Sequence, residues 1–181
     1  MNLYLKFFVL IVKRLFPFKK IGITDLCKTK FMVGLLDLDL NFHMNNGRFF
    51  SVMDLGRFDL MFKTGYFFKL IGNGYYPVVL SESIVFKKSL NLYNFYEVHT
   101  EIDSWDDTFF YMAQKFYYKG QIVASANVRA CFKKRGKRGI VKPLELFEFI
   151  GEDHYENKLT QLSKKQIELD EVLLPRRATS K

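Results

Sequence analysis

The chain contains 181 residues, 49% of them hydrophobic and 17% aromatic, with a formal net charge of +9 at pH 7. This is enough apolar material to bury the core of one domain, which argues against a mainly disordered protein. The positive charge favours an anionic partner. Because no helix-turn-helix, zinc, RNA-binding or basic-zipper pattern accompanies the charge, we expect no nucleic-acid partner. The two cysteines, Cys27 and Cys131, are too few and too far apart in sequence to announce a metal site, and they fit a reducing, cytoplasmic compartment.

Residues 1–20 are predicted to form an amphipathic N-terminal segment. The first 18 residues carry charges only at Lys6, Lys13 and Arg14. The uninterrupted apolar run at 7–12 is far shorter than the roughly 20 residues that a membrane span needs. As a helix, the segment has a polar face with Asn2, Lys6 and Lys13, and a broad apolar face that includes Leu3, Phe7, Leu10 and Val12. This apolar face either packs on the domain or a second subunit, or binds the inner surface of a membrane as a peripheral helix.

Residues 21–151 are predicted to form one α+β domain. Alternation of apolar and polar residues predicts a strand at about 30–35, and a helical period then runs from about 47 to 70. Glycine and proline residues at 72, 74 and 77 end this helix. Four strands are predicted after it, at about 78–89, 95–105, 108–118 and 121–133.

Tight connections at Asp106-Asp107 and Lys119-Gly120 predict antiparallel pairing of consecutive strands. One long central helix followed by a series of strands is the element order of a hotdog fold. In that fold an antiparallel sheet, here of about five strands, wraps around the helix. Residues 152–181 are predicted to be a helical or disordered tail, with a helix at about 158–169 and an exposed end near Pro175.

The segment D-L-D-L-N-F-H-M-N-N, from Asp37 to Asn46, stands between the first strand and the helix. In an extended backbone alternate side chains point to the same side, so we expect Asp39, Asn41 and His43 to face one way. An apolar wall on the other side would then consist of Leu38, Leu40 and Phe42. A carboxylate, an amide and an imidazole at the start of a helix suit chemistry on a carbonyl group.

The motif, the helix after it and the strand series resemble the hotdog thioesterase superfamily, in particular its 4-hydroxybenzoyl-CoA thioesterase-like branch and the membrane-associated eukaryotic relatives. The resemblance covers about residues 20–150. Those relatives share D-L-D-x-N-x-H-M-N-N-x-R-Y, matched here from Asp37 to Phe49 with Phe in place of Tyr, and a later G-W-D-[DE], which appears as Ser104 to Asp107. Plant acyl-ACP thioesterases carry a similar D-x-N-x-H-x-N-N. The resemblance implies a hydrolase of fatty acid metabolism that acts on an acyl-CoA or acyl-carrier-protein thioester, with coenzyme A as part of the substrate and no other cofactor.

The resemblance also implies a role for each motif residue. Asp39 falls on the general base or nucleophile, Asn41 and His43 on its polar partners, and Asn46-Gly47 on the helix start whose amides bind the thioester oxygen. The chemistry supports these roles independently. Thioester hydrolysis needs a group that activates water or attacks the carbonyl carbon directly, and donors must face the oxygen on which negative charge develops.

Other residues have a structural interpretation beside a functional one. Asp37 and Asn45 are expected to cap the helix or bond the turn, and Trp105 is expected to be a packing anchor. Glu82 is the nearest candidate for a glutamate that plant relatives place on the following strand, but the sequence does not fix that alignment. A basic cluster is either a solvated loop or a weak site for the phosphates of coenzyme A, and it consists of Lys133, Lys134, Arg135, Lys137 and Arg138.

Two alternative functions remain open. One is a non-catalytic acyl-CoA-binding or membrane-associated scaffold. The other is a hotdog enoyl-CoA hydratase, which is disfavoured because those enzymes carry D-x-N-P-x-H, with a proline and a longer interval between Asp and His. We also expect a homodimer or homotetramer, because an outer sheet face rich in apolar residues is rarely left to water. The residues expected on that face are Phe110, Met112, Phe116 and Tyr118.

Overall fold

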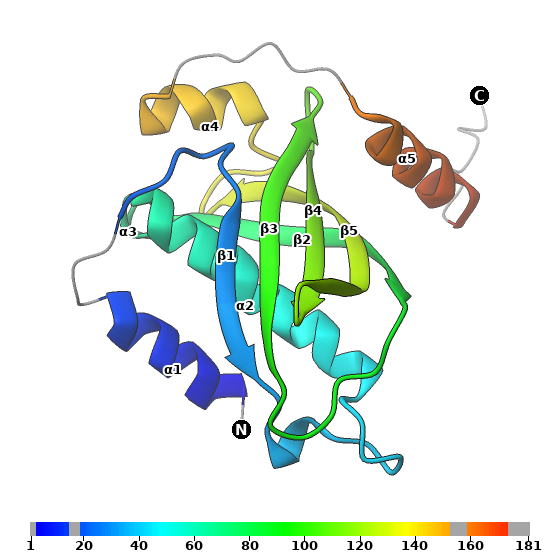
Figure 1. Cartoon of the computed structure of the whole chain (residues 1–181). Helices are drawn as coiled ribbons and strands as arrows, with labels where there is room; N and C mark the ends of the chain where they lie inside the picture. Colours follow the sequence, from blue (N-terminus) through cyan, green and yellow to red (C-terminus); the bar gives the residue numbers. More distant parts are fainter. Residues whose placement is uncertain (1–2, 15–18, 153–158, 174–181) are drawn as a thin grey trace.

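The computed structural model describes residues 3–14, 19–152 and 159–173 (Figure 1). At its centre is a five-stranded antiparallel sheet with the strand order β1-β3-β4-β5-β2. The strands are β1 (Cys27–Met32), β2 (Tyr75–Phe86), β3 (Phe95–Trp105), β4 (Phe110–Tyr118) and β5 (Gln121–Lys134). The long helix α2 (Asn46–Thr64) crosses one face of the sheet. This arrangement confirms the predicted α+β hotdog fold.

Helix α2 ends earlier than its sequence period predicts. Gly65 follows it with φ 83°, in the left-handed region that favours glycine, and its amide donates to the Phe62 carbonyl. A short second helix, α3 (Phe67–Gly72), follows this break. The prediction of one helix to about residue 70 was wrong, because the apolar period continues through the glycine that turns the chain.

The main core lies between α2 and the sheet. The sheet-facing side of α2 buries Phe49, Val52, Met53 and Leu60. At Gly56, also on this side, a Cβ atom would lie only 2.8 Å from Thr100 Oγ1. The helix therefore approaches β3 more closely here than a larger residue would allow.

The apolar residues expected on the outer face of β4 belong to the core instead. Phe110, Met112 and Phe116 are buried, and Tyr118 packs against the main core cluster. Gln114, which shares their side of the strand by alternation, donates to the Met53 carbonyl in α2 at 3.0 Å. This side of β4 faces the helix, so the stated reason for expecting a homo-oligomer was wrong.

Helix α1 (Leu3–Arg14) packs on the domain. Leu10 is buried in the main core cluster, and Leu3 and Phe7 pack against that cluster. The ring centroids of Phe7 and of Phe58 in α2 lie 5.3 Å apart. The structure thus favours the interpretation in which the apolar stripe of this helix covers the core.

Lys6 lies on a different side of α1 from the one expected. This lysine was placed on the polar face, but it is buried, on the same side of the helix as Leu10. The exposed side is itself apolar and carries Tyr4, Leu5 and Phe8. Of the other two residues expected on the polar face, Lys13 is exposed and Asn2 lies outside the described residues. Within the described part of the chain, no helix is long and apolar enough to cross a membrane.

Two further helices complete the described structure. Helix α4 (Pro143–Ile150) was not predicted from the sequence, although it begins with a proline. Its Phe147 ring packs 4.9 Å from Trp105, which confirms the tryptophan as a packing anchor. Helix α5 (Gln161–Leu173) confirms the helix expected in the tail. The expected exposed end near residue 175 lies outside the described residues.

Helix α5 lies against the outer face of the sheet through polar contacts. Gln166 Oε1 accepts a hydrogen bond from Ser83 on β2 at 2.7 Å, and Asp170 Oδ2 accepts one from Arg129 on β5 at 2.9 Å. Residues 81 and 83 alternate with Glu82, which faces α2, so α5 occupies the opposite face of the sheet.

Candidate active site

The motif segment between η1 (Leu35–Asp37) and α2 forms a tight turn. Leu38 and Met44 form an isolated β-bridge, and the Asp39 amide donates to the His43 carbonyl at 2.9 Å. Inside this pair, Phe42 adopts φ 59°. The backbone is therefore folded rather than extended from Asp39 to His43.

The folded turn removes the apolar wall that an extended backbone would have produced. Leu40 is 97% exposed and Phe42 is 77% exposed, so neither covers the motif. Only Leu38 of the three predicted wall residues packs against the main core cluster. That part of the prediction was wrong because it assumed side-chain alternation through a turn.

The turn nevertheless holds Asp39 in a defined orientation. Its Oδ1 atom accepts hydrogen bonds from the Asn41 amide at 2.8 Å and the His43 amide at 3.4 Å. Asp39 is half-buried, whereas Asn41 and His43 are exposed. The three predicted residues thus lie within one turn, where the Asp39 side chain contacts the backbone amides of the other two.

The start of α2 lies directly after this turn. Asn45 caps the helix: its Oδ1 accepts a hydrogen bond from the Gly47 amide at 2.8 Å, which confirms the expected capping role. Gly47 therefore already has an acceptor for its amide. The amide of Asn46, the first helical residue, has no intrahelical acceptor. Of the two predicted oxyanion donors, Asn46 is the one whose amide the helix leaves available.

Asp37 has a structural role in the same segment. It is buried, and its Oδ2 accepts a hydrogen bond from the Gly34 amide at 2.8 Å. Its backbone carbonyl accepts from the Asn45 amide, also at 2.8 Å. The side chain bonds the turn before the motif, as expected, and the carbonyl ties that turn to the helix cap.

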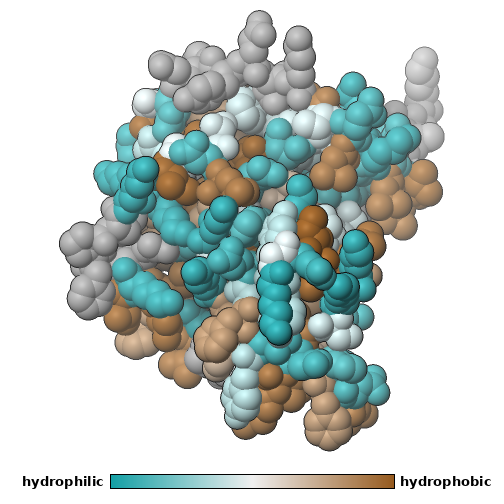
Figure 2. Space-filling model, in the orientation of Figure 1, coloured by the Kyte–Doolittle hydropathy of each residue, from teal (hydrophilic) through white to brown (hydrophobic). Residues whose placement is uncertain are grey.

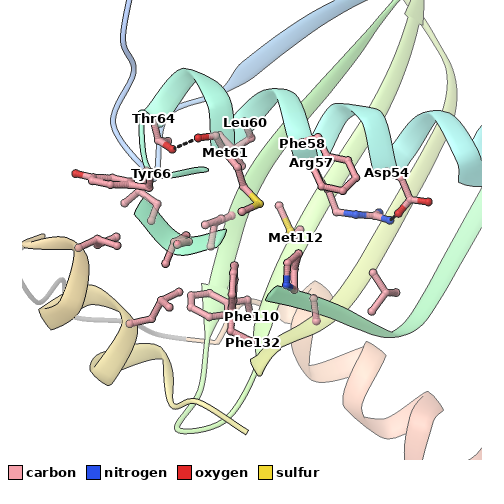
Figure 3. A pocket seen from close by; sticks show the side chains of 18 residues that line it. Asp54, Arg57, Phe58, Leu60, Met61, Thr64, Tyr66, Phe110, Met112 and Phe132 are labelled. Atoms are coloured by element: carbon pink, nitrogen blue, oxygen red, sulfur yellow. Dashed lines mark hydrogen bonds and ion pairs between the residues drawn. The ribbon is translucent and has the colours of Figure 1, made fainter. Parts of the chain in front are cut away.

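An apolar cavity of about 160 Å³ lies beside α2 (Figure 3). Met61 of α2, Met112 of β4 and Phe132 of β5 line it, and α4 contributes Leu146 and Ile150. Figure 3 shows Asp54 and Arg57 at one end and Thr64 and Tyr66 at the other. An apolar cavity of similar size can stay dry and accept a molecule as large as benzene.

The polar end of the cavity is an ion-pair cluster around Arg57. Its Nη2 lies 2.5 Å from Asp54 Oδ1, and its Nη1 donates to Gln114 Oε1 at 2.7 Å. Nη1 also lies 2.7 Å from Glu82 Oε1. The contact with Glu82 is an ion pair without hydrogen-bond geometry, because Glu82 Oε1 accepts no hydrogen bond from any described group. Burial raises the pKa of Glu82 and the Arg57 charge only partly offsets this.

This cluster is distant from the motif within one chain. Arg57 lies eleven positions after Asn46 along α2, which corresponds to about 16 Å at 1.5 Å per residue. The space between the first turn of α2 and the sheet is filled by rings: the Phe49 centroid lies 5.0 Å from that of Phe86 and 4.9 Å from that of Phe116. The structure therefore does not bring Glu82 to Asp39.

The basic cluster lies near the other end of α2. The Arg135 amide donates to the carbonyl of Gly74, just after α3, at 2.9 Å. Lys134 Nζ lies 4.5 Å from the centre of the Tyr75 ring, and Lys137 forms an exposed ion pair with Glu145 at 2.9 Å. Lys133 and Arg138 extend the same segment. One chain thus places these residues away from Asp39, and their binding of coenzyme A phosphates stays a prediction.

The comparisons with known proteins identify the family. The thioesterase-like superfamily matches residues 33–174 of the chain. The chain belongs to this superfamily. The match confirms the resemblance inferred from the motif, and it extends through α5, beyond residue 151 where we expected the domain to end.

Two relatives of this thioesterase-like protein illustrate the likeness. The chain is 28% identical over 137 residues to the Saccharomyces cerevisiae protein named "Probable thioesterase YBR096W", a match that covers 74% of this chain and 57% of the relative. It is 34% identical over 97 residues to protein THEM6 of Xenopus laevis, covering 52% of this chain and 47% of the relative. The chain thus spans about half the length of these curated relatives.

Solved structures share the fold. The E. coli protein titled YbaW probable thioesterase superposes with a TM-score of 0.63 at 19% identity, over 68% of this chain and 96% of that one. The Staphylococcus aureus protein SAV2348, solved in complex with CoA, gives a TM-score of 0.62 at 14% identity, over 80% and 96% of the two chains. At these identities the likeness shows the hotdog fold alone.

No local sequence pattern predicted the Arg57 cluster. Arg57 and Gln114 lie 57 positions apart and meet only because α2 packs across β4 in the folded domain. Neither residue belongs to a motif, and only their polarity on otherwise apolar faces could have signalled them. His99 Nε2 lies 2.9 Å from Glu97 Oε2, two positions earlier and therefore on the same face of β3.

Proposed function

We propose that this protein is an acyl-CoA thioesterase that hydrolyses an acyl thioester to the free acid and coenzyme A. The observation that carries the proposal is the half-buried Asp39 carboxylate, oriented by two backbone amides, one turn before the available amide of Asn46. Membership of the thioesterase-like superfamily supports the same reaction.

In the proposed reaction, Asp39 acts on water or on the thioester itself. As general base it removes a proton from water while the water oxygen bonds to the carbonyl carbon. As nucleophile it forms an anhydride that water then hydrolyses. In both routes the Asn46 amide donates to the oxygen that gains negative charge. The carbon–sulfur bond breaks when the tetrahedral intermediate collapses, which in the nucleophile route precedes attack of water on the anhydride, and the coenzyme A thiolate leaves and takes up a proton. Asn41 and His43 are proposed as the polar partners that contact the substrate beside Asp39.

The far end of a long acyl chain is proposed to occupy the apolar cavity beside α2. The cavity volume of about 160 Å³ suits the last few carbons of such a chain, judged against cavities that bind benzene. Its polar end at Asp54 begins eight residues after Asn46, about 12 Å along the helix. We therefore propose that the thioester enters along the solvent side of α2, since the sheet side is filled by Phe49 and its ring partners.

The exposed edge strand β2 supports the proposal of a homo-oligomer. Strand β2 is an edge strand of twelve residues, and its exposed apolar side chains are Tyr76, Val79, Leu80, Val85 and Phe86. A long edge of this kind pairs readily with another strand. We propose that a second copy pairs along β2.

Contact with a membrane is proposed through the outer side of α1. Tyr4, Leu5 and Phe8 are exposed there, and Lys13 is exposed on the same helix. Apolar groups with flanking cations suit the surface of an anionic bilayer. The protein would then act in the cytoplasm, on the inner face of a membrane. For the thiol carrier we propose coenzyme A over carrier protein, in keeping with the CoA complex of the SAV2348 fold relative.

The decisive experiment is release of free thiol from a panel of acyl-CoAs by the purified full chain. Acetyl-, hexanoyl-, palmitoyl- and benzoyl-CoA cover short, medium, long and ring-shaped acyl groups, with Asp39→Asn as the control. The proposal predicts turnover that is highest for palmitoyl-CoA, because shorter acyl groups do not span the distance from Asn46 to the cavity, and that depends on Asp39. Binding of these thioesters without thiol release would favour the non-catalytic scaffold, and loss of the enoyl absorbance from an enoyl-CoA without thiol release would favour the hydratase.

A further inference from the structure

A lysine in α1 is buried against the segment that precedes the motif. Lys6 is 2% exposed, and its Nζ atom lies 2.5 Å from Asp37 Oδ2. Lysine is almost never fully buried unless it is paired. The lysine and aspartate side chains are 1% and 3% exposed, so water contributes little to solvating either charge.

Asp37 connects this ion pair to the candidate active site. The Oδ2 atom that meets Lys6 also accepts the Gly34 amide, and the Asp37 carbonyl accepts the amide of Asn45, the cap of α2. Two residues later the chain reaches Asp39, whose amide bonds the His43 carbonyl. Both ends of the motif turn are therefore tied to Asp37.

Helix α1 is itself fixed on the core, so Lys6 approaches Asp37 from a rigid element. Leu10 is buried one turn beyond the lysine, and Phe7 packs on Phe58 of α2. The side chains at 3, 6, 7 and 10 follow the spacing of one helical face. A buried lysine in the middle of this apolar face is costly to desolvate, and an apolar pair of the same volume is often at least as stable.

We infer that Lys6 is a positioning residue for the candidate active site: through Asp37 it fixes the turn that presents Asp39 beside the start of α2. A buried ion pair contributes conformational specificity in some proteins even where it adds little stability. Lys6 lies outside residues 33–174, which the superfamily matches, so the family resemblance does not account for this contact. The effect on turnover rests on the proposed function, whereas the effect on the turn does not.

The test compares Lys6→Met with a core variant on strand β3, which lies on neither α1 nor the turn. Val98→Ala removes buried methyl groups from β3 and serves as that control. The double variant Lys6→Met/Asp37→Asn removes both charges, so it avoids an unpaired buried carboxylate if Lys6→Met alone folds poorly. Each variant is measured at a temperature where it is fully folded, for kcat and KM with an acyl-CoA and for hydrogen exchange of the backbone amides from Asp39 to Asn45.

We expect Lys6→Met and the double variant to lower kcat at least about 10-fold with KM changed less than about 3-fold, because the carboxylate is misplaced and the acyl pocket is intact. Exchange of the turn amides should accelerate at least about 10-fold in both, and remain unchanged in Val98→Ala. Turn amides that exchange at the wild-type rate in the double variant would overturn the inference. If the wild-type chain releases no thiol, the proposed function fails while the exchange measurement still decides the positioning role.

Discussion

The Asn45 side chain accepts the Gly47 amide at 2.8 Å and thereby closes the first turn of α2. Because that bond occupies the Gly47 amide, the Asn46 amide is the helix donor left to face a substrate oxygen. Removal of an N-cap acceptor typically costs about 1 kcal/mol. Asn45→Ala should therefore lower the free energy of unfolding by about 1 kcal/mol, as measured by urea denaturation. Asn45→Asp keeps an acceptor oxygen and should stay close to wild type; an equal loss in both variants would contradict the capping role.

The ionisation of Glu82 predicts a pH-dependent stability. Burial raises its pKa above the ordinary value of 4.5, and the Arg57 charge only partly opposes the shift. The folded state thus binds this proton more tightly than the unfolded state. The stability that Glu82 contributes is fully present below pH 4.5 and is lost as pH rises through its raised pKa.

Glu82→Gln should remove that loss, since glutamine keeps the shape of the side chain and does not ionise. Urea unfolding of both proteins between about pH 4 and pH 7 measures this difference. The unfolding free energy of the variant minus that of the wild type should increase as pH rises. Parallel curves for the two proteins would show that the Glu82 pKa is the same in the folded and unfolded states.

Deletion of residues 1–18 should destabilise the domain. The deletion uncovers the surface that Leu10 and Phe7 bury and leaves the buried Asp37 without its ion-pair partner. Loss of one buried leucine alone costs about 2 to 5 kcal/mol in typical cores. Thermal melting of the full and truncated chains provides the measurement, and an unchanged melting temperature would show that α1 is not part of the folded core.

The outer side of α1 provides a separate test of membrane binding. Replacing Tyr4, Leu5 and Phe8 by serine removes the exposed apolar groups and keeps the inner contacts. The melting temperature should stay within a few degrees of wild type, since exposed positions contribute little, while co-sedimentation with anionic vesicles should fall. Vesicle binding equal to that of the wild type would rule out this side as the membrane contact.

The exposed edge of β2 predicts a self-association that one substitution can disrupt. Leu80 lies at a register shift in the pairing of β2 with β5 and is 47% exposed. Leu80→Lys should leave the fold intact and weaken pairing along the edge, because a lysine on an edge strand opposes strand addition. Sedimentation at micromolar concentration should show a homo-oligomer for wild type and a smaller species for the variant. A wild-type monomer would contradict the proposed assembly.

The order of the elements was predictable because local sequence signals set it. Alternation defined β3, β4 and β5 almost to the residue, and tight turns fixed their antiparallel pairing. Helix α4 was missed although Pro143 at its first position is a common start signal. The conformation of the motif depended on Asp39, whose side chain bonds amides two and four residues later. Such bonds are typical of aspartate turns, and the extended-strand assumption ignored them.

The rest of the site depended on contacts that no local pattern reveals. Lys6 and Asp37 lie 31 positions apart and meet only when α1 docks on the core. The helical period placed Lys6 with the polar residues, because a charge counts as solvent-facing unless its partner is known. The Arg57 cluster has the same origin, since it needs α2, β2 and β4 to be packed together.

The most direct test of the proposed function is the turnover of Asp39→Asn. Asparagine keeps the size of the side chain and an oxygen that can accept the Asn41 amide, but it provides neither a base nor a carboxylate nucleophile. The rate of thiol release from the preferred acyl-CoA should fall at least about 100-fold in kcat, with KM and melting temperature close to wild type. Turnover near the wild-type rate in this variant would contradict the assignment of Asp39 as the catalytic carboxylate.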